Sequence, residues 1–170
     1  MRALHWYLAL CVLVGEAPTV AFGRTTCGAP EISSAREVNR FWSLQAIAVV
    51  ERARQANSEH DVRLGRLVAP SAKFSLGAGD VGRPLGTGVT GAQALARDMD
   101  ANTYRFLGWD YMDGPANPCS AHKVAVEFVD SRNKRLSQVE FKFDAGRLVG
   151  AAGWSRSFET GRVKGASARR

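Results

Sequence analysis

Four stretches in the second half of the chain alternate apolar and polar residues with the period of a β-strand. They are TYRFLGWDYMDG (103–114), HKVAVEFVD (122–130), LSQVEFKFD (136–144) and LVGAAGWSRSFE (148–159). A period of two places successive side chains on opposite faces of a sheet. The connections GPANPCS, SRNKR and AGR are rich in turn residues and too short for parallel crossovers. The pattern therefore predicts an antiparallel meander of four strands.

The first half of the chain is typical of helices with one short strand. Ser34 and Glu37 form a capping box, in which each side chain satisfies a free backbone N–H of the other. Apolar residues then recur at helical spacing as far as Ala53, which predicts a long helix buried on more than one side. The further expected elements are a second helix at 61–69, a strand at 71–80, a glycine-rich loop at 77–91 and a third helix from the Thr90–Gln93 capping box.

This order, α-α-β-α-β-β-β-β, predicts an α+β fold, because the helices are segregated from a run of antiparallel strands. A length of 170 residues, with 45% hydrophobic and 23% charged residues, suits one folded domain. The expected boundaries are a signal peptide at 1–23, a linker at 24–33, the domain at 34–160 and a flexible basic tail at 161–170.

A net charge of +7 raises the question of a nucleic-acid partner. Much of the excess lies in the tail, where Arg162, Lys164, Arg169 and Arg170 occur without an acidic residue. A basic end of this kind is typical of a solubilising tail, so no nucleic-acid partner is predicted. The segment GAGDVGRPLGTG lacks the Gly-Lys-Ser/Thr of a phosphate loop.

Residues 1–23 have the composition of a secretory signal, with Arg2 before an apolar run that ends at Gly15, Glu16 and Pro18. Cleavage is expected near Ala21 or Gly23, which gives an exported protein, periplasmic or secreted. The apolar run is shorter than the roughly 20 residues that cross a bilayer, so no stable membrane anchor is predicted.

Cys27 and Cys119 remain after such processing. An even pair in an exported chain is a candidate disulfide, and two unrelated thiols are the alternative. Neither the cysteines nor the histidines have the spacing of a metal site, so no metal and no cofactor are predicted.

The element order, with LVAPSAKFSLG (67–77) and GVTGAQALARDM (88–99), resembles the nuclear transport factor two-like superfamily. This superfamily is also called ketosteroid isomerase-like or polyketide cyclase-like. The closing VEFKFDAGRLVGAAGWSR (139–156) is similar to its final hairpin, and the resemblance covers roughly Ala35 to Glu159. It implies a cone-shaped, curved antiparallel sheet wrapped around the long N-terminal helix, with a pocket at the wide end.

The resemblance also implies where catalytic residues would lie, and this chain departs from the isomerase pattern there. The family's base at the end of the first strand is replaced by Ser75, Leu76 or Gly77. The donor tyrosine of the first helix falls near Phe41 or Trp42. Both departures count against an isomerase of that kind.

Another candidate for chemistry is His122, which by strand alternation shares a face with Val124, Val126 and Phe128. A pair of His122 with Asp110 or Asp98 could transfer protons. The alternative is a strand-end histidine bonded to a loop, with surface aspartates.

Aromatic residues could line an apolar pocket or pack in the core or in a dimer interface. The candidates are Phe41, Trp42, Phe74, Trp109, Tyr111 and Trp154. Three functions therefore remain open: binding of a small apolar or amphipathic ligand in the cone, a lyase- or isomerase-type enzyme using His122, and a non-catalytic interaction module that forms a homodimer.

Overall fold

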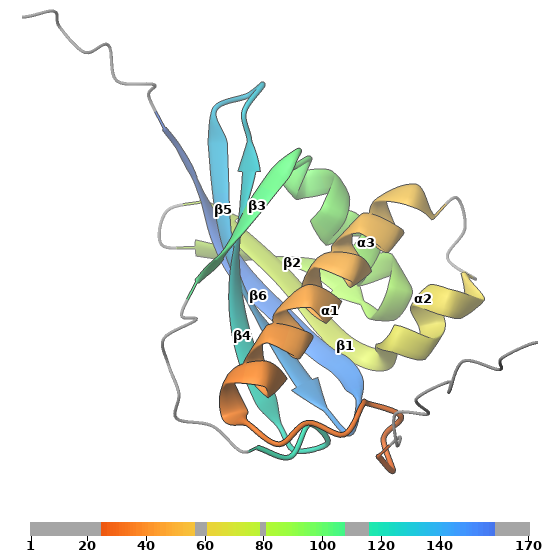
Figure 1. The fold of residues 1–170 in the computed structure, drawn as a ribbon. Helices are drawn as coiled ribbons and strands as arrows, with labels where there is room; N and C mark the ends of the chain where they lie inside the picture. The colour runs from red at the N-terminus through yellow and green to blue at the C-terminus, as the bar shows by residue number, and fades with distance from the viewer. Residues whose placement is uncertain (1–24, 57–60, 79–80, 108–115, 159–170) are drawn as a thin grey trace, which may run out of the picture.

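The computed structural model describes residues 25–56, 61–78, 81–107 and 116–158. The elements in chain order are α1 (Ala35–Gln55), α2 (Val62–Leu67), β1 (Val68–Ala78), β2 (Val81–Thr87), α3 (Gly88–Met99), β3 (Thr103–Leu107), β4 (His122–Asp130), β5 (Arg135–Asp144) and β6 (Arg147–Ser157). The helices lie on one side of a curved, open sheet (Figure 1). The predicted α+β class is confirmed.

The six strands lie in the order β2-β1-β6-β5-β4-β3. The strands from β3 to β6 form an antiparallel meander, as the alternating stretches predict. Strand β6 then runs parallel to β1, with Phe74 beside Ala151. The prediction of a wholly antiparallel sheet is wrong at this pair. Because β2, α3 and the strands β3 to β5 separate β1 from β6 in the chain, no short turn dictates their relative direction.

The glycine-rich segment is not the predicted loop. Residues 81–87 form β2, which pairs antiparallel with β1 at the edge of the sheet, so the predicted element order lacks one strand. The register shifts between the partners of Phe74 and Ser75, which are Gly86 and Pro84. Proline is tolerated at an edge strand or a bulge, where no ladder hydrogen bond is lost. Glycine and proline content alone therefore predicted the wrong state.

Helix α1 begins at its predicted cap. The Ser34 hydroxyl accepts the backbone N–H of Glu37 and donates to the Glu37 carboxylate. Its buried residues are Val38, Trp42, Ser43, Ala46, Ile47, Val49, Val50 and Ala53, and they form the centre of the core. Leu44 is 45% exposed, so the buried stripe is narrower than the sequence pattern indicates.

Helix α3 begins three residues before the predicted capping box. Its N-cap is Thr87, and Thr90 lies inside the first turn, where its hydroxyl donates to the Thr87 carbonyl. A Cβ placed on Gly91 would lie 2.6 Å from the Phe74 ring and 2.8 Å from the Gly86 carbonyl oxygen. Glycine at this position therefore lets the helix approach β1 and β2 closely.

The hairpin between β5 and β6 turns at Ala145 and Gly146, which both have positive φ angles of 45° and 80°. Two consecutive positive φ values match the twist of the flanking strands. No helix within the described ranges is long and apolar enough to cross a membrane.

Candidate functional site

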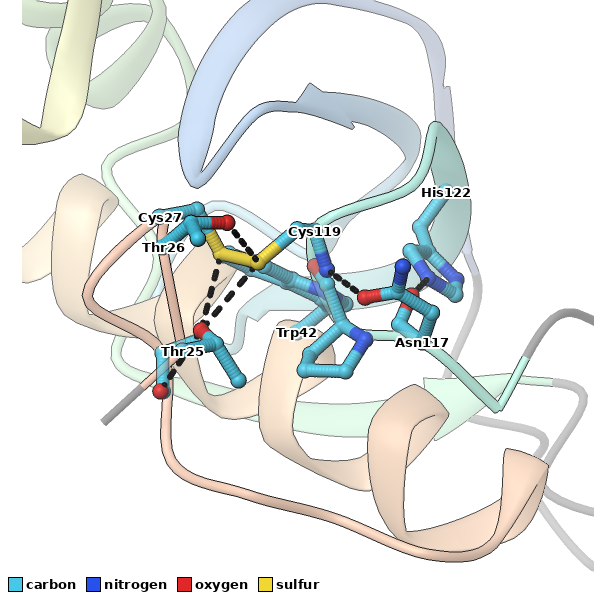
Figure 2. Close-up of a disulfide and its surroundings, with 9 residues drawn as sticks. Thr25, Thr26, Cys27, Trp42, Asn117, Cys119 and His122 are labelled. Carbon is cyan, nitrogen blue, oxygen red and sulfur yellow. Dashed lines mark hydrogen bonds between the residues drawn. A yellow bond between two sulfur atoms is a disulfide. The ribbon is translucent and has the colours of Figure 1, made fainter. Parts of the chain in front are cut away.

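His122 opens β4 on the helix-covered face of the sheet and is 9% exposed. Its Nε2 lies 2.9 Å from the carbonyl oxygen of Asn117. Because a carbonyl only accepts, Nε2 carries the proton in this contact. The ring lies 6.4 Å from that of Trp42, centroid to centroid (Figure 2). The environment of His122 is thus a packed one with a satisfied backbone partner.

Trp42 is the centre of this region, which we call the closed end of the sheet: Trp42, His122, Phe143 and residues 117–119. The Trp42 ring stacks on Phe143 at 4.5 Å, and its Nε1–H donates to the Pro118 carbonyl at 3.2 Å. The indole is only 2% exposed. A stacked ring and a satisfied indole N–H describe core packing.

A disulfide joins Cys27 to Cys119 at the closed end, with the Cα atoms 5.6 Å apart (Figure 2). The Thr25 oxygen lies 3.2 Å from one sulfur and 3.1 Å from the other, and the hydroxyl donates to the Ala29 carbonyl. A Cβ on Gly146 would lie 2.5 Å from the Cys27 carbonyl oxygen. The N-terminal segment is therefore held against the 117–119 loop and the β5–β6 turn.

The structure brings no carboxylate to His122 among the residues it describes. Asp98, near the end of α3, forms an ion pair with Arg83 of β2. Asp98 also lines a hollow with Arg135, which lies across the β4–β5 ladder from Asp130 at the far end of β4. The nine-residue strand makes that end about 26 Å from His122. Asp110 lies outside the described residues.

The predicted pocket aromatics that the structure describes do not share a cavity. Phe74 is 2% exposed and packs under α3, while Phe41 contacts Trp42 edge-on at 4.8 Å. Trp154 lies on the sheet face away from the helices, with the Arg156 guanidinium 5.3 Å from its ring centroid. Trp109 and Tyr111 lie outside the described residues.

A hollow of about 300 Å³ lies at the opposite end of the helix-covered face, which we call the open end. Its described lining residues are Leu76, Gly77, Ala78, Arg83, Asp98, Arg135 and Ser155, which come from β1, β2, α3, β5 and β6. Two of these, Leu76 and Gly77, occupy the strand end where the family resemblance implies a catalytic base. Neither side chain can accept a proton, and the one carboxylate of the described lining, Asp98, is held in an ion pair with Arg83.

Arg135 is the unusual group of the hollow. Its Nε atom is buried and has no hydrogen-bond partner within the described part of the chain. Asp130 lies directly across the β4–β5 ladder, yet it forms no ion pair with Arg135. A buried donor without a partner costs free energy, typically about 1–3 kcal/mol.

Asp130 does not pair with Arg135 because both of its carboxylate oxygens accept hydrogen bonds from the β4–β5 turn. Its Oδ1 accepts the backbone N–H groups of Arg132 and Asn133, each at 3.1 Å, and its Oδ2 accepts the Asn133 side chain at 2.6 Å. These hydrogen bonds, with that of the Asn133 side chain first, lower the pKa of Asp130 below its ordinary 3.8, against the opposing effect of burial. The Asp130 carboxylate therefore serves the turn.

Two hydroxyls lie beside Arg135 on the same face of the sheet. Ser137 follows Arg135 by one alternation along β5, and its Oγ lies 2.6 Å from Oγ of Ser155 on β6. Ser137 is buried and Ser155 is half-buried in the hollow. Only one hydroxyl proton lies in the bond between them, so the other can be donated to a third group.

Three other hollows have fewer elements in their described lining, and two of them, of about 290 and 60 Å³, are each lined from four elements. One of about 340 Å³ has only α1 residues as its described lining, from Ser34 to Ser43. No group of three or more His, Cys, Asp or Glu side chains within the described ranges could hold a metal ion.

Sequence reasoning missed the open end, although a signal was present. Strand alternation places Arg135 and Ser137 on the face of Val139, Phe141 and Phe143. A charged residue at a core-facing strand position is rarer than a histidine at a strand end. The sequence did not predict that the Arg135 side chain points toward a cavity. Residues 81–87 were expected to form a loop, so the position of α3 over the sheet was undefined.

Comparisons with known proteins identify no relative by sequence. No family model matches the chain, and no curated protein matches it. Among solved structures it is similar to a phenazine biosynthesis-related protein from Pseudomonas aeruginosa, with 10% sequence identity over 78% of this chain and 90% of that one. The TM-score is 0.34, and no conclusion about fold or activity rests on it. The chain is an α+β protein with a curved, open, mixed sheet.

Proposed function

We propose that this protein binds a small amphipathic molecule in the open-end hollow. The observation that carries the proposal is a cavity of about 300 Å³ to which five separate elements contribute. Small-molecule sites typically measure about 300–1,000 Å³ and combine apolar walls with a few converging polar groups. Leu76, Gly77 and Ala78 supply the apolar wall here, and Ala78 lies beside Ser155 in the β1–β6 ladder.

The catalytic alternative has less support. His122 donates to a backbone carbonyl, and Asp98 is paired with Arg83. A proton-transfer pair would need these side chains within reach of one substrate atom.

The interaction-module alternative would use the uncovered face of the sheet. One cross-strand row on that face holds Arg105, Glu127, Gln138 and Trp154, with an ion pair between the first two. Only Trp154 in this row is a large apolar group, whereas contiguous apolar patches mark interaction surfaces. A homodimer through this face remains a secondary proposal, and sedimentation of the pure protein tests it.

Export belongs to the same proposal. Residues 1–23 have the composition of a cleaved signal, and a disulfide in a small protein suits an oxidising compartment. The intact mass of protein recovered from the exported fraction of its host should correspond to cleavage near Ala21 or Gly23. An intact N-terminus in that fraction would contradict the signal peptide.

Native mass spectrometry of this exported protein is the experiment for ligand binding. We expect a co-purifying small molecule in the wild type. Ser155→Phe should fill the hollow and abolish the adduct. Ala152→Phe, on the opposite face of β6, is the matched control and should retain it. A wild type without an adduct, or an adduct that survives in Ser155→Phe, would overturn the proposal.

A further inference from the structure

Building on the proposed binding function, we propose that the ligand is a monocarboxylate. Its carboxylate would pair with Arg135, and its apolar body would lie along the end of β1. Three features of the open end lead to this class of ligand: an uncompensated charge, nearby hydroxyl donors and an adjoining apolar wall.

The charges around the hollow leave one cation without a partner. Arg83 and Asp98 compensate each other as an ion pair. The Asp130 carboxylate accepts from Arg132 and Asn133, and the Arg132 guanidinium pairs with Asp100 at 3.2 Å. Among the described residues, Arg135 alone of these groups forms no ion pair or hydrogen bond through its side chain. An anion in the hollow would give it one.

The shape of the donor set fits a carboxylate. A guanidinium presents parallel N–H groups that match the two oxygens of a carboxylate, and such paired bonds are short and strong. The terminal Nη groups of Arg135 are not covered as its Nε is, so they supply this pair of donors to the hollow. The Ser137 and Ser155 hydroxyls, 2.6 Å apart, provide another donor on the same face.

A single negative charge suits the site better than a phosphate. One unpaired cation faces the hollow, and the Asp98 carboxylate lines it too. A dianion would therefore carry one charge without a partner near a carboxylate, which is costly in a partly buried site. The apolar wall formed by Leu76, Gly77 and Ala78 adjoins the polar groups, so an aliphatic or aromatic body beside the carboxylate can be buried.

The test measures binding of butanoate, hexanoate and octanoate, of their neutral amides, and of inorganic phosphate. Isothermal titration calorimetry of the mature protein supplies the affinities. We expect at least one acid to bind about tenfold or more tightly than its amide, with phosphate weaker than that acid. Arg135→Gln should weaken the acid by about 10- to 100-fold and leave the amide unchanged.

Two variants and one spectrum separate recognition from folding. Arg156→Gln, on the uncovered face, should bind as the wild type does, and Arg135→Lys should retain part of the affinity because it keeps the charge. In wild-type protein, the ¹⁵N–¹H signal of Arg135 Nε should shift on titration with the acid. This measurement uses wild-type protein, so it does not depend on a destabilised variant. The signal is assigned to Arg135 because it disappears in Arg135→Lys.

Equal affinity for acids and amides would overturn the carboxylate inference while leaving the binding hollow intact. Tighter binding of phosphate, or an unshifted Nε signal, would do the same. Absence of binding by every acid would also overturn it. The co-purification experiment with Ser155→Phe then decides independently whether the hollow binds anything.

Discussion

The two ends of the helix-covered face use polar groups in opposite ways. At the closed end, the His122 and Trp42 nitrogens each donate to a loop carbonyl, and a disulfide holds the same loop. Arg147, beside the β5–β6 turn, has a buried Nε without a partner but donates through Nη2 to the Gly65 and Val68 carbonyls. At the open end, Arg135 lines a hollow of about 300 Å³, and its side chain forms no hydrogen bond or ion pair among the described residues. Satisfied polar groups indicate structure, whereas an unsatisfied one beside a cavity indicates a place for a ligand.

Side-chain size explains why one end is filled and the other is hollow. Large rings meet at the closed end, where Trp42 stacks on Phe143. At the open end the inward positions of β1, β5 and β6 include Ala78, Ser137 and Ser155, whose side chains are small. The same sheet therefore supports a core at one end and a cavity at the other.

The largest expected effect is at the closed end and concerns the disulfide. The bond closes a loop with a sequence separation of 92 residues, and its removal restores that freedom to the unfolded chain. The double variant Cys27→Ser/Cys119→Ser should lose about 2–5 kcal/mol of unfolding free energy in urea titrations.

Thiol titration is the direct control for this prediction. Denatured, unreduced protein lacking residues 1–23 should show no free thiol. Two free thiols per chain, or a double variant as stable as the wild type, would mean that the closed end does not depend on the bond.

The second prediction concerns His122. His122→Ala leaves the Asn117 carbonyl without its donor, which should cost about 1–3 kcal/mol in urea titrations. His122→Gln retains a donor and should recover part of this loss. Ligand binding at the open end should be unchanged in both variants. A stable His122→Ala protein that no longer binds ligand would reverse the roles of the two ends.

Much of the fold could be predicted because its signals are local. The Ser34 cap, the apolar face of α1 and the alternation in β4, β5 and β6 each depend on neighbours within a few residues. Strand β2 and the parallel β1–β6 pair depend instead on distant partners. Nothing in residues 81–87 favours a strand until an exposed edge of β1 is available.

The candidate site was harder to predict for the same reason. His122 was identified because histidine is a common catalytic group, but its chemistry depends on the 117–119 loop, which provides its partner. Arg135 became a candidate binding residue only because the structure shows that the Asp130 carboxylate is hydrogen-bonded to the β4–β5 turn. Whether a charged side chain has a partner is a property of the three-dimensional arrangement and not of the sequence around it.

The third prediction uses pH to separate Asp130 from its neighbour Arg135. Hydrogen bonds lower the pKa of Asp130 in the folded protein, so its contribution to stability is fully present above its ordinary, unfolded-state pKa of 3.8. It is lost as pH falls through the lower folded value. Asp130→Asn should therefore be less stable than wild type at neutral pH, and the difference should shrink in acid.

Urea titrations between neutral pH and pH 2 measure this effect. Asp144→Asn, an exposed aspartate beside the other hairpin turn, is the matched control and should follow the wild-type curve. A stability difference that stays constant down to pH 2 would mean that Asp130 acts through its shape and not through its charge.

The smallest expected change in stability is that of Arg135, and it defines the open end. The Nε atom lost its hydration on folding without gaining a partner, so removing the group forfeits no hydrogen bond among the described residues. Arg135→Met keeps most of the apolar stem, which packs along the sheet. Its unfolding free energy without ligand should stay within about 0.5 kcal/mol of the wild type, or rise.

Calorimetric melts of both proteins, with and without hexanoate, provide the measurement: the acid should stabilise the wild type and not the variant. A loss of 2 kcal/mol or more in the ligand-free variant would show that Arg135 supports the fold, and the contrast between the two ends would then fail.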